Sequence, residues 1–259
     1  MSTRSLVSPE ASKRFDVLRT LLVVFVIGIH AEKGLQAYYS AMPEALNVYL
    51  AVFPHNLFRL SVPLFFAVSG YLFFLTYKPD AASYGRMILK KTKSILVPFL
   101  IFNAITLILI KVFNKVPYIG DFHAIDADGY IKLLIGIYRY PVVYTLWFLR
   151  DLYVYFLLAP VFYVFSREMP LTGLIACWAA WMFLPQGRIP IELSGLVFFY
   201  GGCVLARTRA DLDGLARFAW PVGLGYLALM AVTATYECLY GCQSYYHILR
   251  SEEHTSELQ

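Results

Sequence analysis

The chain has 259 residues, of which 59% are hydrophobic and 15% charged, with a net charge of +5. Its mean hydropathy is +0.60. This composition argues against an ordinary soluble domain, in which about a quarter of the residues are charged. We find no Lys/Arg-rich arm that would indicate a nucleic-acid partner. The four cysteines are too scattered to predict a disulfide scaffold or a metal site.

The apolar residues come in runs of roughly 15 to 20, the length that crosses a bilayer as a helix. We therefore predict an all-α fold, a polytopic transmembrane helix bundle with about seven spans. In chain order the spans cover residues 15–36, 57–75, 94–110, 146–165, 171–184, 193–205 and 220–236. The apolar stretch 128–145 is interrupted by Lys132, Arg139 and Pro141, which is typical of an interfacial or re-entrant helix.

Basic residues predict the orientation of these spans. Residues 77–93 and 206–218 are rich in Lys and Arg, and both segments follow even-numbered spans. The alternating loops are more acidic, with Glu44, Asp121 and Asp126 among their residues. Because cytoplasmic loops carry an excess of Lys and Arg, the pattern places the N-terminus in the cytoplasm.

The first span contains the run "RTLLVVFVIGIH", which begins at Arg19 and ends at His30. Eleven residues of α-helix rise about 16 Å and turn about three times, so both side chains face the same way. An ionisable residue inside a span is usually functional, and a neutral imidazole is suited to act as a general base. The alternative is a structural histidine that bonds a neighbouring helix.

The second span contains "VPLFFAVSGYLF". Pro63 loosens the helical hydrogen bonding, and the small residues Ser69 and Gly70 let another helix or a ligand approach closely. Simple helix packing explains the motif equally well. Arg59 lies one turn after His55, where it would either contact an acceptor or cap the helix.

Three lysines, Lys90, Lys91 and Lys93, precede the third span. They would either bind phosphates or set topology and bind lipid headgroups. The fourth span begins with "LWFLRDLYVYFLLAP", where Trp147 would belong to an aromatic belt or stack on a sugar. Its adjacent charges, Arg150 and Asp151, would lie near the outer interface and could snorkel.

Two features concern the C-terminal part of the sequence. Cys238 and Cys242 are predicted to lie outside the cytoplasm, either as a disulfide or as two reduced cysteines. The last ten residues, "RSEEHTSELQ", resemble the translation of a sequencing-library adapter. We therefore expect a membrane domain over residues 1–249, incomplete at its C-terminal end, and an artefactual tail over residues 250–259.

These segments, in this order, resemble the acyltransferase 3 family of polytopic bacterial enzymes. The matching segments are the Arg-x10-His run, "VPLFFAVSGYLF", "KKTKSILVPF", "LWFLRDLYVYFLLAP" and "LVFFYGGCVLA". The resemblance covers residues 15 to about 246 and implies about ten spans in the bacterial inner membrane. It also implies an O-acyltransferase that moves an acyl group, acetyl by default, onto an extracytoplasmic glycan or glycolipid.

The resemblance implies a role for each candidate residue. Lys90, Lys93 and Arg19 would face cytoplasmic acyl-CoA, the donor, and His30 would be the general base, or alternatively would carry the acyl group covalently. The substrate-binding candidates are Ser69, Trp147, Arg59, Arg150 and Asp151. No bound cofactor, metal or oligomeric state is predicted, and the partners are the lipid bilayer, acyl-CoA and the glycan acceptor.

Two other functions are consistent with intramembrane charges. A transporter or flippase also uses Arg and His inside spans, but no inverted repeat or pair of Gly/Pro-broken spans is visible in corresponding halves of this sequence. A catalytically silent sensor or interaction subunit is the third interpretation. Consumption of acyl-CoA distinguishes the enzyme from both alternatives.

Overall fold

The computed structural model describes residues 9–33, 57–112, 127–137, 141–184, 191–209, 214 and 217–240. Within these ranges every regular element is helical and no strand is present, which confirms the predicted all-α class. The described residues fall into two compact units. One contains residues 1–15 and 62–209, and the other contains residues 16–61 and 210–259.

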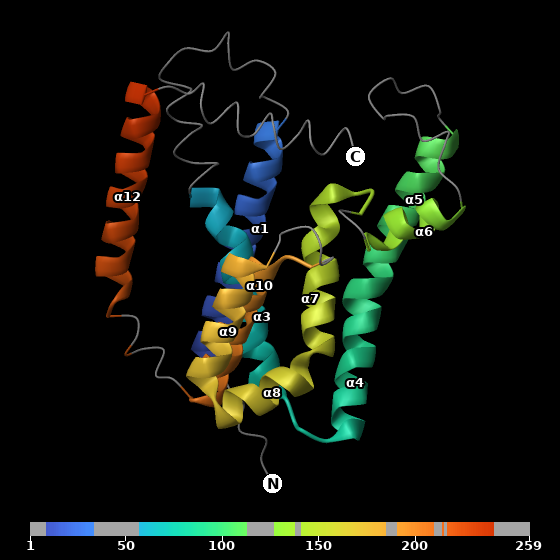
Figure 1. Ribbon diagram of the computed structural model, residues 1–259, viewed down its shortest axis with the longest axis horizontal. Helices are drawn as coiled ribbons and strands as arrows, with labels where there is room; N and C mark the ends of the chain where they lie inside the picture. Colours follow the sequence, from blue (N-terminus) through green and yellow to red (C-terminus); the bar gives the residue numbers. More distant parts are fainter. Residues whose placement is uncertain are drawn as a thin grey trace. The chain divides into compact units, whose positions relative to one another are not determined.

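The helices follow the predicted spans closely (Figure 1). Four segments cover the first half of the chain: α1 (Pro9–Lys33), the 3-10 turn η3 (Phe58–Leu60) with α3 (Ser61–Thr76), α4 (Ala81–Lys91), and the π-helical turn η4 (Thr92–Leu96) with α5 (Val97–Val112). The second half contains α6 (Ala127–Ile135), η6 (Tyr144–Leu146), α7 (Trp147–Leu157), α8 (Ala159–Glu168), α9 (Pro170–Phe183), α10 (Leu193–Arg207) and α12 (Ala219–Tyr240).

Length and composition make some of these helices candidate membrane spans. Among the described residues, Phe58–Thr76 and Ala81–Val112 are long and apolar enough to cross a bilayer. The pair α7 and α8 passes the same test only when the two helices are counted as one span. Three apolar helices are shorter, over residues 170–183, 193–207 and 220–233. The count of seven spans therefore stays a prediction.

The fourth predicted span is not a straight helix. Its two halves, α7 and α8, meet at Leu158 with a bend of 60°. Pro160 occupies the first turn of α8. Backbone N–H groups in the first turn have no partner within the helix, so a proline is tolerated there. The prediction of one continuous helix over residues 146–165 is wrong, since the proline starts a new helix.

The third predicted span is longer than expected, because the basic segment before it is helical. The side chain of Asp80 accepts a hydrogen bond from the Ser83 N–H at 2.8 Å and caps α4. This hydrogen bond lowers the pKa of the Asp80 carboxyl. The helix continues through η4, where the Val97 N–H donates a hydrogen bond to the Thr92 carbonyl. The π-helical turn precedes Pro98, which has no N–H to donate.

Aromatic side chains form the core of the larger unit. Phe66, Phe73, Tyr155, Phe156 and Phe199 are at most 4% exposed. The Phe73 and Phe156 rings stack with their centroids 4.7 Å apart, and the Tyr155 and Phe199 rings are 5.4 Å apart. The core therefore joins α3, α7 and α10.

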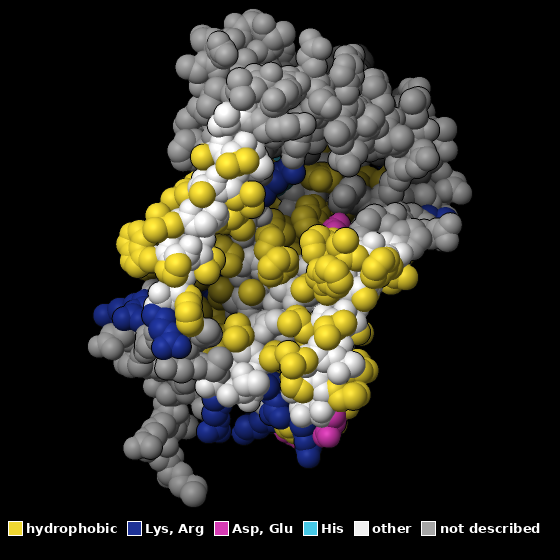
Figure 2. Space-filling view, turned by 60° about the vertical axis from the view of Figure 1, so that its left-hand side comes forward, with side chains coloured by type: hydrophobic (Ala, Val, Ile, Leu, Met, Phe, Trp, Pro, Cys, Tyr) yellow, Lys and Arg dark blue, Asp and Glu magenta, His cyan; other side chains and the backbone are white. Residues whose placement is uncertain are grey.

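Glycines set the distance between α3 and α10. A Cβ on Gly70 would collide with the Phe199 carbonyl, and one on Gly202 would collide with the Ala67 carbonyl. The close approach of another helix at Gly70, expected from the sequence, is confirmed. Side chains away from such contacts stay exposed, and Figure 2 shows hydrophobic side chains over the faces of the helices.

Candidate functional site

Arg19 and His30 lie on the same continuous helix, α1. Their spacing of eleven residues places both side chains on one face of that helix. The Arg19 guanidinium lies 3.8 Å from the Asp16 carboxylate, and both side chains are exposed. His30 is half-buried. The helix therefore presents one basic group at an exposed turn and one imidazole about 16 Å further along.

The segment that carries Arg59 packs against α1 at Phe25 and Gly28, within two turns of His30 along the helix. The Phe58 ring lies 5.2 Å from the Phe25 ring, measured between centroids. A Cβ on Gly28 would lie 2.6 Å from the Phe58 ring, so a larger residue there would require that ring to shift. Gly28 precedes His30 by two residues, and Arg59, which is exposed, follows Phe58 directly. The structure thus brings the Arg59 segment to the His30 end of α1.

A buried polar network surrounds Arg150 and Asp151 in the larger unit. The Arg150 Nε donates to Asp151 Oδ1 at 2.8 Å, and Asp151 is completely buried. Asp151 Oδ2 accepts a hydrogen bond from the Glu192 N–H at 2.7 Å. The Arg150 guanidinium also donates to the Gly136 carbonyl, and the Tyr155 hydroxyl donates to the Glu192 carbonyl. The network therefore ties α7 to the residue before α10 and to the turn after α6.

This geometry corrects one expectation about the pair. Asp151 does not snorkel to the outer interface, because its carboxylate points into the bundle and is held by protein donors. A charge inside a membrane bundle is stable only when it is paired in this way. The proposed contact of Arg150 and Asp151 with substrate stays a prediction.

The core residue Phe66 relates the positions of Trp147 and Ser69. Trp147 begins α7, one turn before Arg150, and is half-buried against Phe66 with their ring centroids 6.4 Å apart. Ser69 is half-buried three residues after Phe66 on α3, a spacing that places both on one helix face. Phe66 also packs on Tyr155 with ring centroids 5.3 Å apart, so this turn of α3 contacts α7 at both Trp147 and Tyr155, and Ser69 lies one turn further along α3.

Basic side chains lie in the last turns of α4, η4 and α10. Lys90 and Lys93 are exposed on either side of Lys91, whose Nζ lies 4.6 Å from the centre of the Phe156 ring. The Arg207 guanidinium stacks 4.4 Å from the centre of the Tyr163 ring. Its Nε is buried without a hydrogen-bond partner in the described part of the chain.

Arg207 was not a candidate from the sequence, where it counted only toward topology. The available signal was its position at the end of the Phe- and Gly-rich helix α10. A half-buried guanidinium with an unused donor is suited to bind an anionic oxygen. Cys238 and Cys242, expected either as a disulfide or as two reduced cysteines, and the tail from Arg250 lie outside the residues whose side chains are described.

Comparison with known proteins gives two matches. A family model described as "Acyltransferase domain" matches residues 12–254. The "Succinoglycan biosynthesis protein ExoH" of Rhizobium meliloti (strain 1021) is 29% identical over 233 residues. The alignment covers 86% of this chain and 61% of the relative, so the chain spans less than two thirds of that protein. No solved structure matches significantly.

Proposed function

The chain belongs to the acyltransferase 3 family, whose domain model matches residues 12–254, and from this we propose that it is an integral membrane O-acyltransferase. In this proposal the enzyme lies in the bacterial inner membrane with its N-terminus in the cytoplasm. It moves an acyl group, acetyl by default, from cytoplasmic acyl-CoA to a hydroxyl of an extracytoplasmic glycan or glycolipid. The relative is named for succinoglycan biosynthesis, which supports a polysaccharide acceptor.

The observation that carries the proposal is the placement of Arg19 and His30 on one face of an unbroken helix. In the reaction, the acceptor hydroxyl attacks the thioester carbonyl carbon while His30 takes the hydroxyl proton. The carbon–sulfur bond then breaks, and the proton passes to the departing CoA thiolate. General base assistance of this kind contributes about a hundred- to ten-thousand-fold in rate.

The donor would be held through its phosphates at the basic end of the larger unit. Exposed Lys90 and Lys93 offer point charges. Arg207 adds a planar donor whose Nε is buried without a hydrogen-bond partner in the part of the chain described. Lys90 and Lys93 lie in residues 77–93 and Arg207 in residues 206–218. The positive-inside rule predicts that both segments face the cytoplasm, where acyl-CoA is found. Charge, location and an unused donor therefore support the same assignment.

The acceptor would enter from the other side of the membrane. Trp147 begins α7 and offers a ring face for a sugar, and Arg150 lies one turn later. The Arg59 segment, at the His30 end of α1, is the other polar candidate on that side. Ser69 remains the candidate donor of a hydrogen bond to the thioester oxygen.

The proposal is tested by replacing His30 with Ala. Membranes that contain the protein are incubated with acetyl-CoA labelled in the acetyl group, and the label transferred to glycan is counted. We expect a loss of at least about a hundredfold with unchanged protein abundance, because the base is removed. The matched variant Ser94→Ala, at an exposed position of η4, should retain transfer.

Two results would contradict the assignment. Full transfer by His30→Ala would show that another group accepts the proton. Movement of glycan across the membrane without any consumption of acyl-CoA would instead show a transporter, the alternative that the intramembrane charges leave open. An acyl-histidine trapped on wild-type protein by rapid acid quenching would favour the covalent route through His30.

A further inference from the structure

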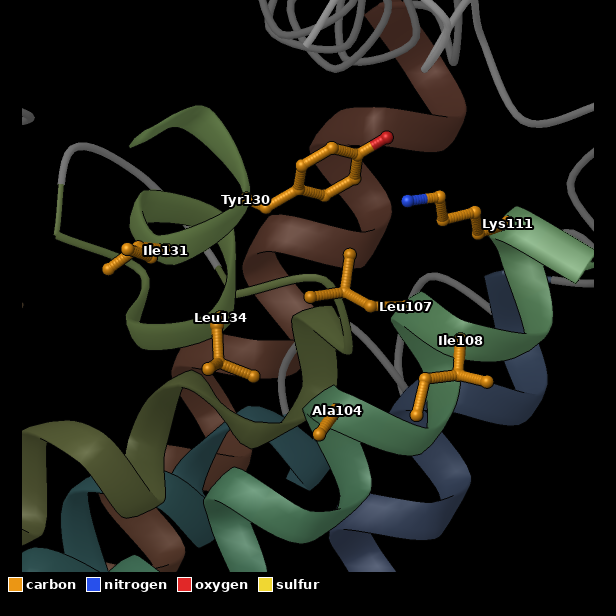
Figure 3. Close-up of a pocket in the computed structure, with 7 residues that line it drawn as sticks. All are labelled: Ala104, Leu107, Ile108, Lys111, Tyr130, Ile131 and Leu134. Atoms are coloured by element: carbon orange, nitrogen blue, oxygen red, sulfur yellow. The ribbon is translucent and has the colours of Figure 1, made fainter. Parts of the chain in front are cut away.

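An apolar groove lies between α5 and α6 and has a volume of about 300 Å³ (Figure 3). Its walls are aliphatic, and are made by Ala104, Leu107 and Ile108 of α5 and by Ile131 and Leu134 of α6. Ile108 is 61% exposed and Ile131 is 54% exposed. The groove therefore opens toward the surroundings of the helices, which for a membrane protein are lipid chains.

Among the described residues that line this groove, one is a cation, Lys111. The Lys111 ammonium lies 5.6 Å from the centre of the Tyr130 ring, and Figure 3 shows the two side chains pointing toward one another. Lys111 is exposed and occupies the last turn of α5. The predicted topology puts this turn at the extracytoplasmic face, where phospholipid headgroups lie. An aliphatic groove with a cation at its mouth is complementary to a lipid chain that ends in a phosphate.

We propose that the groove binds one acyl chain of an anionic phospholipid, with the lipid phosphate at the Lys111 ammonium. The aliphatic walls favour a hydrocarbon chain over a sugar, because burial of apolar surface is the main gain they offer. The volume lies at the lower limit of ligand pockets, about 300–1,000 Å³, and suits one acyl chain better than a long isoprenoid. The Lys111 ammonium is complementary to the negative charge of a lipid phosphate.

Residues next to the groove lining connect it to the Arg150 network. Asn103, next to Ala104, accepts a hydrogen bond from the Val143 N–H at 2.9 Å. Gly136, two residues after Leu134, accepts one from Arg150. A lipid in the groove would therefore hold α6 against α5 and support the segment to which Arg150 is bonded. The inference needs only a membrane protein and does not rest on the proposed acyl transfer.

Photo-crosslinking of the intact protein in nanodiscs tests the site. The probe is phosphatidylglycerol with a diazirine in one acyl chain, and labelled peptides are mapped by mass spectrometry. We expect labelling of residues 104–111 and 130–134 to exceed labelling of α9 about fivefold. The reference helix α9 is a fair comparison, because its Leu171 and Ile175 are 71% and 64% exposed. Equal labelling of the groove and α9 would overturn the proposal.

Two variants separate the headgroup from the chain. Lys111→Gln should remove a preference of about fivefold for phosphatidylglycerol over phosphatidylcholine, the size expected for one lysine beside an anionic lipid. The control Lys132→Gln, on α6 but not among the residues that line the groove, should keep that preference. Leu107→Trp should fill the groove and reduce labelling there by either lipid. An unchanged preference in Lys111→Gln, or displacement of phosphatidylglycerol by an equal amount of polyprenyl phosphate, would overturn the assignment of the occupant.

Discussion

At the scale of single residues, Asp151 shows how the chain keeps a carboxylate inside the helical bundle. One oxygen is held by Arg150 at 2.8 Å and the other by the Glu192 N–H at 2.7 Å. Because these partners come from α7 and from the residue before α10, the carboxylate joins two helices that the sequence separates by about forty positions. The contrast is the pair Asp16–Arg19, which is exposed and lies within one helix.

We predict that Asp151→Ala lowers the free energy of unfolding by about 3–5 kcal/mol, because it leaves the Arg150 charge and the Glu192 N–H without their partner. Thermal unfolding in detergent, followed by tryptophan fluorescence, measures the change. The control Asp16→Ala breaks an exposed pair and should change stability by less than about 1 kcal/mol. Equal stability of the two variants would show that the buried network contributes little to folding.

At the scale of secondary-structure elements, two neighbouring glycines of α10 have different roles. Gly202 faces α3, where a Cβ would collide with the Ala67 carbonyl. Gly201 faces away, with nothing within 4 Å of its Cβ position. The Ala67 carbonyl belongs to the backbone and cannot move aside as a flexible side chain can. The close spacing of α3 and α10 at Gly202 therefore requires a residue without a side chain.

Gly202→Ala should destabilise the protein by about 1–3 kcal/mol, since α3 and α10 must separate to admit the methyl group. Gly201→Ala should leave stability unchanged or raise it by up to about 1 kcal/mol, because alanine favours the helix over glycine. Both variants make the same Gly→Ala change, at neighbouring positions of α10. Equal thermal stability of both would contradict the close contact of α3 with α10.

At the scale of the whole molecule, the charge pattern and the helices together predict how the chain crosses the membrane. Exposed Gly85 and Arg209 lie in segments predicted to be cytoplasmic, and exposed Ile137 lies in one predicted to be extracytoplasmic. Because α7 and α8 are bent relative to one another, a test of the topology also tests whether this pair crosses the membrane. A broken helix either crosses the membrane or returns to the same side, and helix length alone does not distinguish these cases.

Single cysteines at these three positions, in a cysteine-free background, report the side on which each lies. We expect a membrane-impermeant maleimide to label Ile137→Cys in intact cells. Gly85→Cys and Arg209→Cys should react only after the cells are opened, because the positive-inside pattern places them in the cytoplasm. Labelling of Arg209→Cys in intact cells, with Gly85→Cys protected, would mean an odd number of crossings between the two and would contradict the seven-span topology.

The sequence by itself determined the helical class, the approximate positions of most apolar helices and the family. Helix positions follow from runs of apolar residues, which are local properties of the chain. The Arg19–His30 register likewise needed only the pitch of a helix. The family resemblance depended on five quoted segments in order, and the family model confirms it over residues 12–254.

Only the tertiary structure decided which polar groups meet. The sequence placed Asp151 near a water interface, but the fold buries it because donors arrive from Arg150 and from Glu192, some forty residues away. It gave Arg207 no more than a topological role, whereas the fold stacks it on Tyr163 with an unused donor. The bend at Leu158 was also missed. The two polar contacts depend on segments that are distant in the sequence, and local apolar periodicity carries no information about them. The bend, by contrast, has a local cause in Pro160 that the hydrophobic pattern concealed.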